Sequence, residues 1–272
     1  MIKNSFKPLA VLVLRGGLGN QLHQVCAMAR MSRERDFHVL ITDINTFHLN
    51  RGSGGTEIFE LEIDSWFSKP QKVFLLQERG RYFLRILFAL NRLLGVPKFL
   101  NEESLKIIDR LPPLFIVQDY FQSKDYPDSF SVEQLKGVLI SNKTSNQFIC
   151  SDQSVGVHIR LKDFLYVPES YLDSSYYLKA ISHFVSRNMQ TFDCYSDDLF
   201  GAKQMLGSLD NLEINYLENP ITATSIDLLI SMSKHPYFIC SKSSLCWWAR
   251  YLHFRENSVN HDFHCWPEKL SF

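Results

Sequence analysis

Residues 9–24 read LAVLVLRGGLGNQLHQ, the pattern of a strand, a turn and a helix. The apolar run before the glycines is short enough for a buried strand of a parallel sheet, and a helix-like segment begins at Asn20. This order brings backbone N–H groups and a helix N-terminus to one point, which suits an anion or a sugar phosphate. Gly17 and Gly19 match part of the dinucleotide-binding fingerprint, but Leu22 replaces its third glycine. No Gly-Lys-Ser/Thr follows, so the loop is not that of a phosphate-binding NTPase.

A second segment of ligand-binding type, residues 155–163, reads VGVHIRLKD. Ligands collect at the carboxyl ends of strands in open α/β sheets, and the planar guanidinium of Arg160 suits a phosphate there. Asp163 is expected to orient Arg160 rather than to transfer a proton, and Lys162 offers a second cation. Two interpretations of His158 stay open: a histidine satisfied within the strand, or a contact to a nucleotide. For the whole segment, the alternative is a strand followed by a solvated charged turn.

Strand-like and helix-like segments alternate along the chain, which predicts an α/β fold with parallel sheets. The polar stretch 141–147 is expected to link two halves, so the predicted domains are residues 1–148 and 149–272. The expected strands are 9–14, 38–42, 114–118, 154–159, 191–196, 212–216 and 237–240, and the expected helices are 20–33, 81–94, 171–188, 224–233 and 243–254.

The composition is that of a compact soluble protein. The 272 residues are 45% hydrophobic and carry no formal net charge, so a broad electrostatic surface for nucleic acid is not expected. The six cysteines are scattered in apolar runs without a Cys-x-x-Cys pair, which favours reduced core thiols over disulfides or a zinc site. Neither a signal peptide nor a membrane span is evident, so a cytoplasmic location is expected.

Five segments carry recognisable motifs: 16–21, 120–123, 157–164, 195–198 and 227–249. In this order they resemble the motifs of the α-1,2-fucosyltransferase family, glycosyltransferase family 11. The resemblance implies two Rossmann-like domains facing a cleft (GT-B-like), an N-terminal acceptor-side domain and a C-terminal domain that binds the nucleotide sugar. It further implies a bacterial enzyme that transfers L-fucose from GDP-fucose, with inversion, to the 2-hydroxyl of a β-galactoside in a surface glycan such as an O-antigen. Leu161, Lys162 and Lys242 depart from the family's pattern, which bears on donor preference and on neutralisation of the phosphate charge.

The resemblance also assigns residues to the reaction. Arg160 would stabilise the negative charge that develops on the leaving β-phosphate. A carboxylate of the first domain would be the general base, with Asp43 and Asp119 as candidates, although a plain strand-end turn also explains Asp43. The residues expected to contact the donor are Gly17, Gly19, Asn20, Gln21, His158, Arg160, Lys162, Asp197, Asp227, Ser243 and Ser244, and those expected on the acceptor side are Tyr120 and Gln122.

Some of these residues also have a structural interpretation. Asp227 begins a helix-like segment, where it either caps the helix or accepts hydrogen bonds from a guanine edge. Ser243 and Ser244 precede a helix, where capping and phosphate binding are compatible. Asp197 and Asp198 are expected to be structural or to contact a ribose, with a metal site as the alternative. We expect no metal, because arginine, lysine and helix N-termini can supply the positive charge.

Two other functions stay open from the sequence. One is transfer of a related GDP-6-deoxysugar such as GDP-colitose, because the motifs describe the nucleotide end of a donor better than the sugar. The other is a non-catalytic protein that binds a nucleotide or a glycan. The presence of two loops of anion-binding type, one in each predicted domain, argues against the second.

The segment 79–94 reads RGRYFLRILFALNRLL and predicts a basic amphipathic helix. Arg81, Arg85 and Arg92 fall near one helical face, and apolar residues occupy the rest. Such a helix can lie in an anionic membrane surface, so peripheral contact with the inner membrane is one expectation. The alternative is an ordinary helix that faces the core and keeps its arginines in water.

Overall fold

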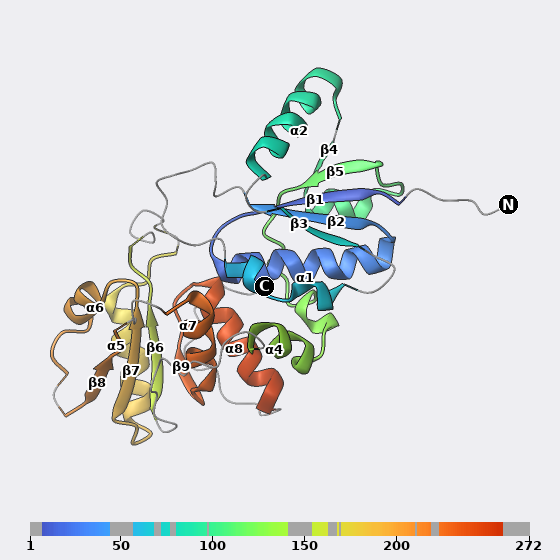
Figure 1. Cartoon of the computed structure of the whole chain (residues 1–272). Helices are drawn as coiled ribbons and strands as arrows, with labels where there is room; N and C mark the ends of the chain where they lie inside the picture. The colour runs from blue at the N-terminus through green and yellow to red at the C-terminus, as the bar shows by residue number, and fades with distance from the viewer. Residues whose placement is uncertain are drawn as a thin grey trace. The chain divides into compact units, whose positions relative to one another are not determined.

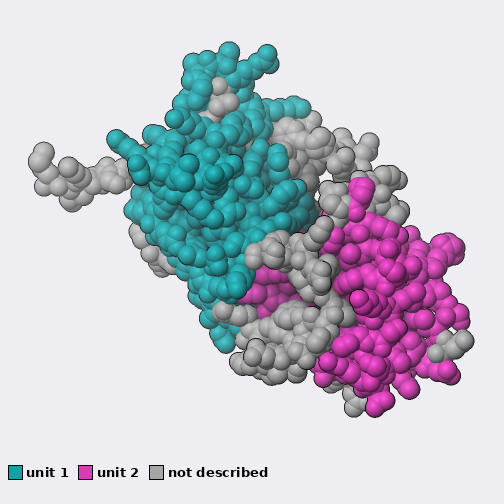
Figure 2. All heavy atoms as spheres, turned by 180° about the vertical axis from the view of Figure 1, so that it is seen from behind, with its two compact units in different colours: residues 1–142 teal, residues 143–272 magenta. Residues whose placement is uncertain are grey.

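The computed structural model divides the chain into two compact units, residues 1–142 and 143–272 (Figures 1 and 2). The sequence places the boundary at 148/149, and both positions fall in 141–153, outside the described residues. The structure describes residues 7–43, 57–67, 72–76, 80–96, 98–140, 154–162, 168, 170–209, 211–218 and 223–257.

Unit 1 contains a five-stranded sheet with the order β3-β2-β1-β5-β4, in which all neighbouring strands are parallel. The central strand is buried from Ala10 to Leu14, which explains its unbroken apolar sequence, because both faces of a parallel sheet are covered. The strands are β1 (Leu9–Leu14), β2 (His38–Asp43), β3 (Val73–Leu76), β4 (Lys98–Leu100) and β5 (Leu114–Val117).

Helix α1 (Leu18–Arg35) follows β1 and is buried over most of its length against β1 and β2. Helix α2 (Gly80–Leu94) contacts the sheet through Leu87, which packs with Val11, Val13 and Ile116. The remaining helices of the unit are α3 (Glu102–Ile107), α4 (Val132–Ile140) and the 3-10 helices η2 (Glu57–Glu60), η3 (Ile63–Trp66) and η4 (Pro127–Ser129).

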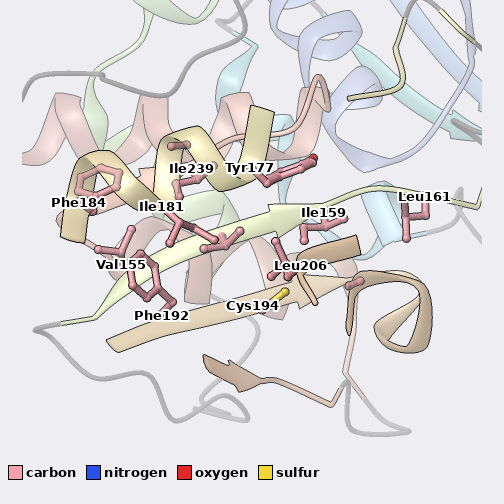
Figure 3. Packing of buried hydrophobic residues seen from close by; sticks show 13 residues of the cluster. Val155, Ile159, Leu161, Tyr177, Ile181, Phe184, Phe192, Cys194, Leu206 and Ile239 are labelled. Atoms are coloured by element: carbon pink, nitrogen blue, oxygen red, sulfur yellow. The ribbon is translucent and has the colours of Figure 1, made fainter. Parts of the chain in front are cut away.

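Unit 2 contains a four-stranded parallel sheet with the order β8-β7-β6-β9. On one face of this sheet, Val155, Val157 and Ile159 pack against apolar side chains of two helices (Figure 3). The strands are β6 (Val155–Ile159), β7 (Thr191–Ser196), β8 (Glu213–Tyr216) and β9 (Tyr237–Ile239), and the helices are α5 (Ser174–Val185), α6 (Leu199–Leu206), α7 (Ser225–Lys234) and α8 (Ser244–Asn257).

A buried polar network joins elements of unit 2. Tyr195 Oη lies 2.7 Å from His235 Nε2 and 2.8 Å from Ser231 Oγ. Ser154 Oγ donates to Asp193 Oδ2 over 2.5 Å and lies 3.3 Å from His235 Nδ1. Buried polar groups need such partners, so this network fixes how β6, β7 and α7 pack together.

The predicted α/β class and the parallel sheets are confirmed, and β1 and β7 have the predicted bounds. The sequence missed the short strands β3 and β4, both at edges of the unit 1 sheet, and helices α3, α4 and α6. The cysteines within the described residues, Cys26, Cys194, Cys240 and Cys246, are buried free thiols, as expected, and Cys150 and Cys265 lie outside those residues.

The close contact between β6 and β9 gives a stability prediction. A Cβ atom on Gly156 would lie 2.2 Å from ring atoms of Phe238, which is itself buried. We therefore expect Gly156→Ala to lower the free energy of unfolding by about 1–3 kcal/mol in denaturant titrations. The matched control is Gly137→Ala within α4, where nothing lies within 4 Å of the new methyl group and helix propensity favours alanine by up to about 1 kcal/mol. Equal stability of the two variants would contradict this packing.

Candidate active site

The strand order of each sheet points to one ligand-binding edge. In unit 2 the chain runs from β6 outward to β7 and β8 and then crosses to β9 on the other side of β6. In unit 1 it runs from β1 outward to β2 and β3 and reaches β5 on the other side of β1. Open α/β sheets bind ligands at the carboxyl ends of the strands where the order reverses. The expected crevices therefore lie after β6 and β9 in unit 2, and after β1 and β5 in unit 1.

Arg160 directly follows β6, at the predicted end of a strand. Its Nε lies 3.2 Å from Oδ2 of Asp197, which follows the neighbouring strand β7. Oδ1 of the same carboxylate accepts a hydrogen bond of 2.8 Å from the backbone N–H of Leu161. Asp197 thus braces both the side chain of Arg160 and the backbone after it, the role that the sequence analysis gave to Asp163. Asp163 itself lies outside the described residues.

The loop between β9 and α8 lies beside this ion pair. Val157 pairs with Ile239, so Arg160 and Lys242 each stand three residues beyond paired positions of adjacent strands. Ser244 is the first residue of α8, the carbonyl of Ser243 accepts from Trp247 N, and the first turn has no acidic residue. Lys242 and the positive end of a 14-residue helix therefore follow β9, the strand paired with β6.

His158 is buried inside this edge. Its Nδ1 lies 2.7 Å from Ser241 Oγ, and its side chain is 3% exposed. Burial, followed by the nearby charge of Arg160, lowers the pKa of His158 to about 4, although Asp197 opposes the shift. The imidazole is therefore neutral near pH 7 and ties β6 to the loop after β9. This geometry is that of a histidine satisfied within the fold, and a nucleotide contact by His158 stays a prediction.

Two acidic residues of unit 2, Asp198 and Asp227, each cap a helix. Asp198 caps α6 by accepting a 3.0 Å hydrogen bond from Gly201 N. Asp227 forms a capping box with Thr224 at the start of α7, with bonds of 2.9 and 2.7 Å to Asp227 Oδ2. The structural interpretation of Asp227 is thus observed, and its contact with guanine stays a prediction. Within the residues that the structure describes, three or more histidine, cysteine or acidic side chains do not gather into a metal-binding group.

In unit 1, hydrogen bonds tie the glycine loop after β1 to the segment after β5. Arg15 Nη2 donates to Gln118 Oε1 over 3.1 Å, and Gln122 Nε2 donates to Asn20 Oδ1 over 2.9 Å. Gln21 is buried, and its Nε2 donates to the carbonyl of Gly16 over 2.9 Å. Asn20, expected on the donor side, and Gln122, expected on the acceptor side, therefore belong to one patch. The buried side chain of Gln21 therefore holds the glycine loop from inside unit 1, and its amide is not exposed to solvent.

The backbone of this loop approaches α1 closely. Gly16 has a φ of +73°, and a Cβ there would lie 2.5 Å from Asn20 Nδ2, so the turn requires glycine. Gly17 is the exposed N-cap of α1 and offers no side chain to cap the helix, whereas Gly19 is buried in its first turn. No side-chain hydrogen bond from the N-cap residue reaches the first backbone N–H groups of α1, and an anion site there stays a prediction.

The two candidates for the general base, Asp119 and Asp43, differ in their surroundings. Asp119 accepts backbone hydrogen bonds at both oxygens, from Glu102 N at 3.0 Å and from Tyr120 N at 2.7 Å. Tyr120 is 43% exposed, so its ring is accessible to a ligand. Asp43 ends β2 and pairs with Leu14, at the edge that carries the glycine loop, and its side chain lies outside the described residues.

Sequence reasoning missed several polar residues at these edges. Arg15 and Gln118 directly follow β1 and β5, and Ser241 follows β9. Their position immediately after a strand was the available signal, because every strand of a parallel sheet ends at the same edge.

The chain thus has two α/β units, each with a parallel sheet and with polar residues at the strand ends, and folds of this class bind ligands at that edge. The model of glycosyl transferase family 11 matches residues 120–265, more than half of the chain. The chain belongs to this family and is a glycosyltransferase.

The other comparisons with known proteins add nothing to the family assignment. The chain is similar to the crystal structure of the glycosyl transferase family 9 from Veillonella parvula DSM 2008, with 10% sequence identity and a TM-score of 0.40. This similarity covers 88% of this chain and 78% of the other. No curated protein sequence matches the chain. None of the helices in the described part of the chain combines the length and the apolar character that crossing a membrane requires.

The brace on Arg160 gives a prediction for Asp197→Asn. An amide removes the charge that holds the guanidinium, and a small displacement of a catalytic group can cost roughly 100-fold in rate. We expect kcat to fall by about that factor with the fold retained, and Asp197→Glu to recover part of the loss. The control is Asp198→Asn, which removes the charge of the neighbouring carboxylate while asparagine can still cap α6, so kcat and stability should both change little. Equal kcat values for Asp197→Asn and the wild type would contradict the brace.

Proposed function

We propose that this glycosyltransferase moves L-fucose from GDP-fucose to the 2-hydroxyl of a β-galactoside in a surface glycan such as an O-antigen, with inversion at the sugar. Membership of family 11 supports the class of reaction, and the motif resemblance supports the donor and the linkage. The observation that carries the proposal is Arg160, braced by Asp197 at the end of β6 beside the N-terminus of α8.

The reaction breaks the bond between fucose C1 and an oxygen of the β-phosphate, and it forms a bond between C1 and the acceptor oxygen. GDP leaves with the electron pair of the broken bond, so negative charge grows on its β-phosphate while the sugar gains oxocarbenium character. A fixed cation lowers the energy of this transition state. Arg160 takes that role in the proposal, and Lys162 and the start of α8 at Ser243 and Ser244 help to hold the diphosphate.

The acceptor hydroxyl must lose its proton to a base as it attacks. We assign this role to Asp43, because Asp119 uses both of its carboxylate oxygens to hold backbone N–H groups. Asp163 would support Arg160, and Asp227 would accept from the guanine edge.

In the proposed function, residues of unit 1 make the remaining contacts with the donor and the acceptor. Gly17, Gly19 and Asn20 would approach the sugar end of the donor, with Gln21 supporting their loop, and Tyr120 and Gln122 would contact the acceptor. The proposal includes no metal, since side-chain cations and helix N-termini carry the required positive charge. It also places the enzyme in the cytoplasm.

The proposal is tested by incubating the full chain with GDP-fucose and a panel of β-galactosides. The expected product carries fucose on O2 of galactose with inverted anomeric configuration, as identified by NMR. GDP-colitose and other GDP-6-deoxysugars compete in the same assay, and preferential use of one of them would replace the donor assignment. Hydrolysis or transfer of none of these donors would contradict the proposal.

The same assay in EDTA tests the absence of a metal. Activity is expected to survive chelation, because the positive charge at the leaving phosphate comes from the protein. Complete loss in EDTA, restored by magnesium or manganese, would reverse this part of the proposal.

Arg160→Lys tests the cation itself. An ammonium group keeps the charge but loses the planar pair of donors, so transition-state stabilisation is expected to fall by roughly 2–4 kcal/mol, measured as kcat/KM. The matched control is Arg110→Lys, at an exposed arginine outside both strand-end sites, for which kcat/KM should not change. Near-normal turnover by Arg160→Lys, with thermal unfolding confirming an intact fold, would remove Arg160 from the mechanism.

A further inference from the structure

Helix α2 exposes an apolar stripe that the fold of unit 1 does not cover. Tyr82, Ile86, Leu90 and Leu93 are spaced so that they lie on one helical face, and they are 66%, 59%, 38% and 78% exposed. Leu87 is the buried contact of the helix with the sheet, at 4% exposure. Figure 1 shows α2 projecting from the sheet of unit 1. The alternative interpretation of this segment required the apolar residues to face the core. The exposed stripe does not.

The apolar surface continues beyond the stripe. Leu94 and Val96, at the end of the helix and just after it, are 69% and 53% exposed. Phe99 of β4 is 41% exposed and stacks on Phe88 of α2, with ring centroids 5.4 Å apart. Exposed apolar groups scattered singly are ordinary, but a contiguous patch marks an interaction site. We call Tyr82, Ile86, Leu90, Leu93, Leu94 and Val96 the α2 surface.

Charge identifies the partner. Arg85 and Arg92 are exposed and are seven residues apart, which places them on one face, next to the apolar stripe. From Gly80 to Val96 the sequence contains three arginines and no carboxylate. A second copy of this helix would bring like charges together, whereas an anionic surface would neutralise them. An apolar stripe bordered by arginines has the layout of a helix that lies in a lipid interface.

We propose that the α2 surface docks unit 1 on an anionic phospholipid bilayer, with the apolar stripe in the boundary of headgroups and acyl chains and the arginines among the phosphates. The helix would lie in the plane of the membrane surface. Docking would hold the enzyme where a lipid-linked glycan presents its acceptor, a consequence that rests on the proposed function. The docking itself does not, because vesicle binding needs neither donor nor acceptor.

The test is co-sedimentation of the full chain with phosphatidylcholine vesicles, with and without phosphatidylglycerol, at low and high salt. Wild-type protein is expected to bind only the anionic vesicles and to be released near 1 M salt, where the screening length falls to about 3 Å. Arg85→Gln with Arg92→Gln is expected to weaken the partition constant roughly 30-fold, about fivefold for each arginine. Ile86→Asp with Leu93→Asp is expected to abolish binding.

Controls separate docking from misfolding and from general stickiness. Ile107→Asp changes an equally exposed apolar residue of α3, at 74% exposure, and Arg110→Gln removes an exposed arginine elsewhere. Both should bind vesicles like the wild type, and thermal unfolding should be unchanged in all variants.

Failure of the wild type to sediment with anionic vesicles at low salt would overturn the proposal. So would equal binding by the α2 and Ile107 variants, or self-association through α2 without vesicle binding in sedimentation velocity. A protein that binds vesicles but transfers no fucose would overturn only the proposed function.

Discussion

The ion pair between Arg160 and Asp197 is the interaction on which the proposed donor site depends. An exposed arginine alone would be a flexible cation, and flexible groups contribute little to transition-state stabilisation because ordering them costs entropy. Asp197 reduces that cost by holding Nε and the backbone of Leu161 together. The pairing of Ile159 with Ser196 makes this possible, because it brings the ends of β6 and β7 side by side. In the proposed mechanism, the pairing of β6 with β7 therefore positions the cation as well as stabilising the fold.

The same edge also shows how unit 2 divides apolar and polar groups. One face of the sheet packs Val155, Val157 and Ile159 in an apolar cluster, while His158, on the opposite face by strand alternation, bonds to Ser241. A neutral buried histidine costs less to bury than a charged one, and the depressed pKa follows from that cost. Strand β6 is thus buried along its length, and the charged residue Arg160 follows its carboxyl end.

The long buried strands were predictable because both of their faces are covered and their sequences are continuously apolar, as in β1. The edge strands β3 and β4 were not, since four and three residues give too little pattern to separate a strand from a loop. At the site, Arg160 was predictable from its place after a strand. Its brace was not, because Asp197 is adjacent only through sheet pairing, and the sequence favoured the neighbouring Asp163. For α2, periodicity predicted the amphipathic helix but not which face the sheet would cover.

A crystal structure of the full chain with GDP bound would show directly whether unit 2 holds the leaving group. We expect the diphosphate at the carboxyl end of β6, with the Arg160 guanidinium on the β-phosphate, Asp197 still paired with Nε, and the start of α8 donating backbone N–H groups. The sequence also predicts an anion site at the glycine loop of unit 1, so the experiment has a clear alternative. A diphosphate bound there, without contact to Arg160, would contradict the claim that unit 2 holds the leaving group.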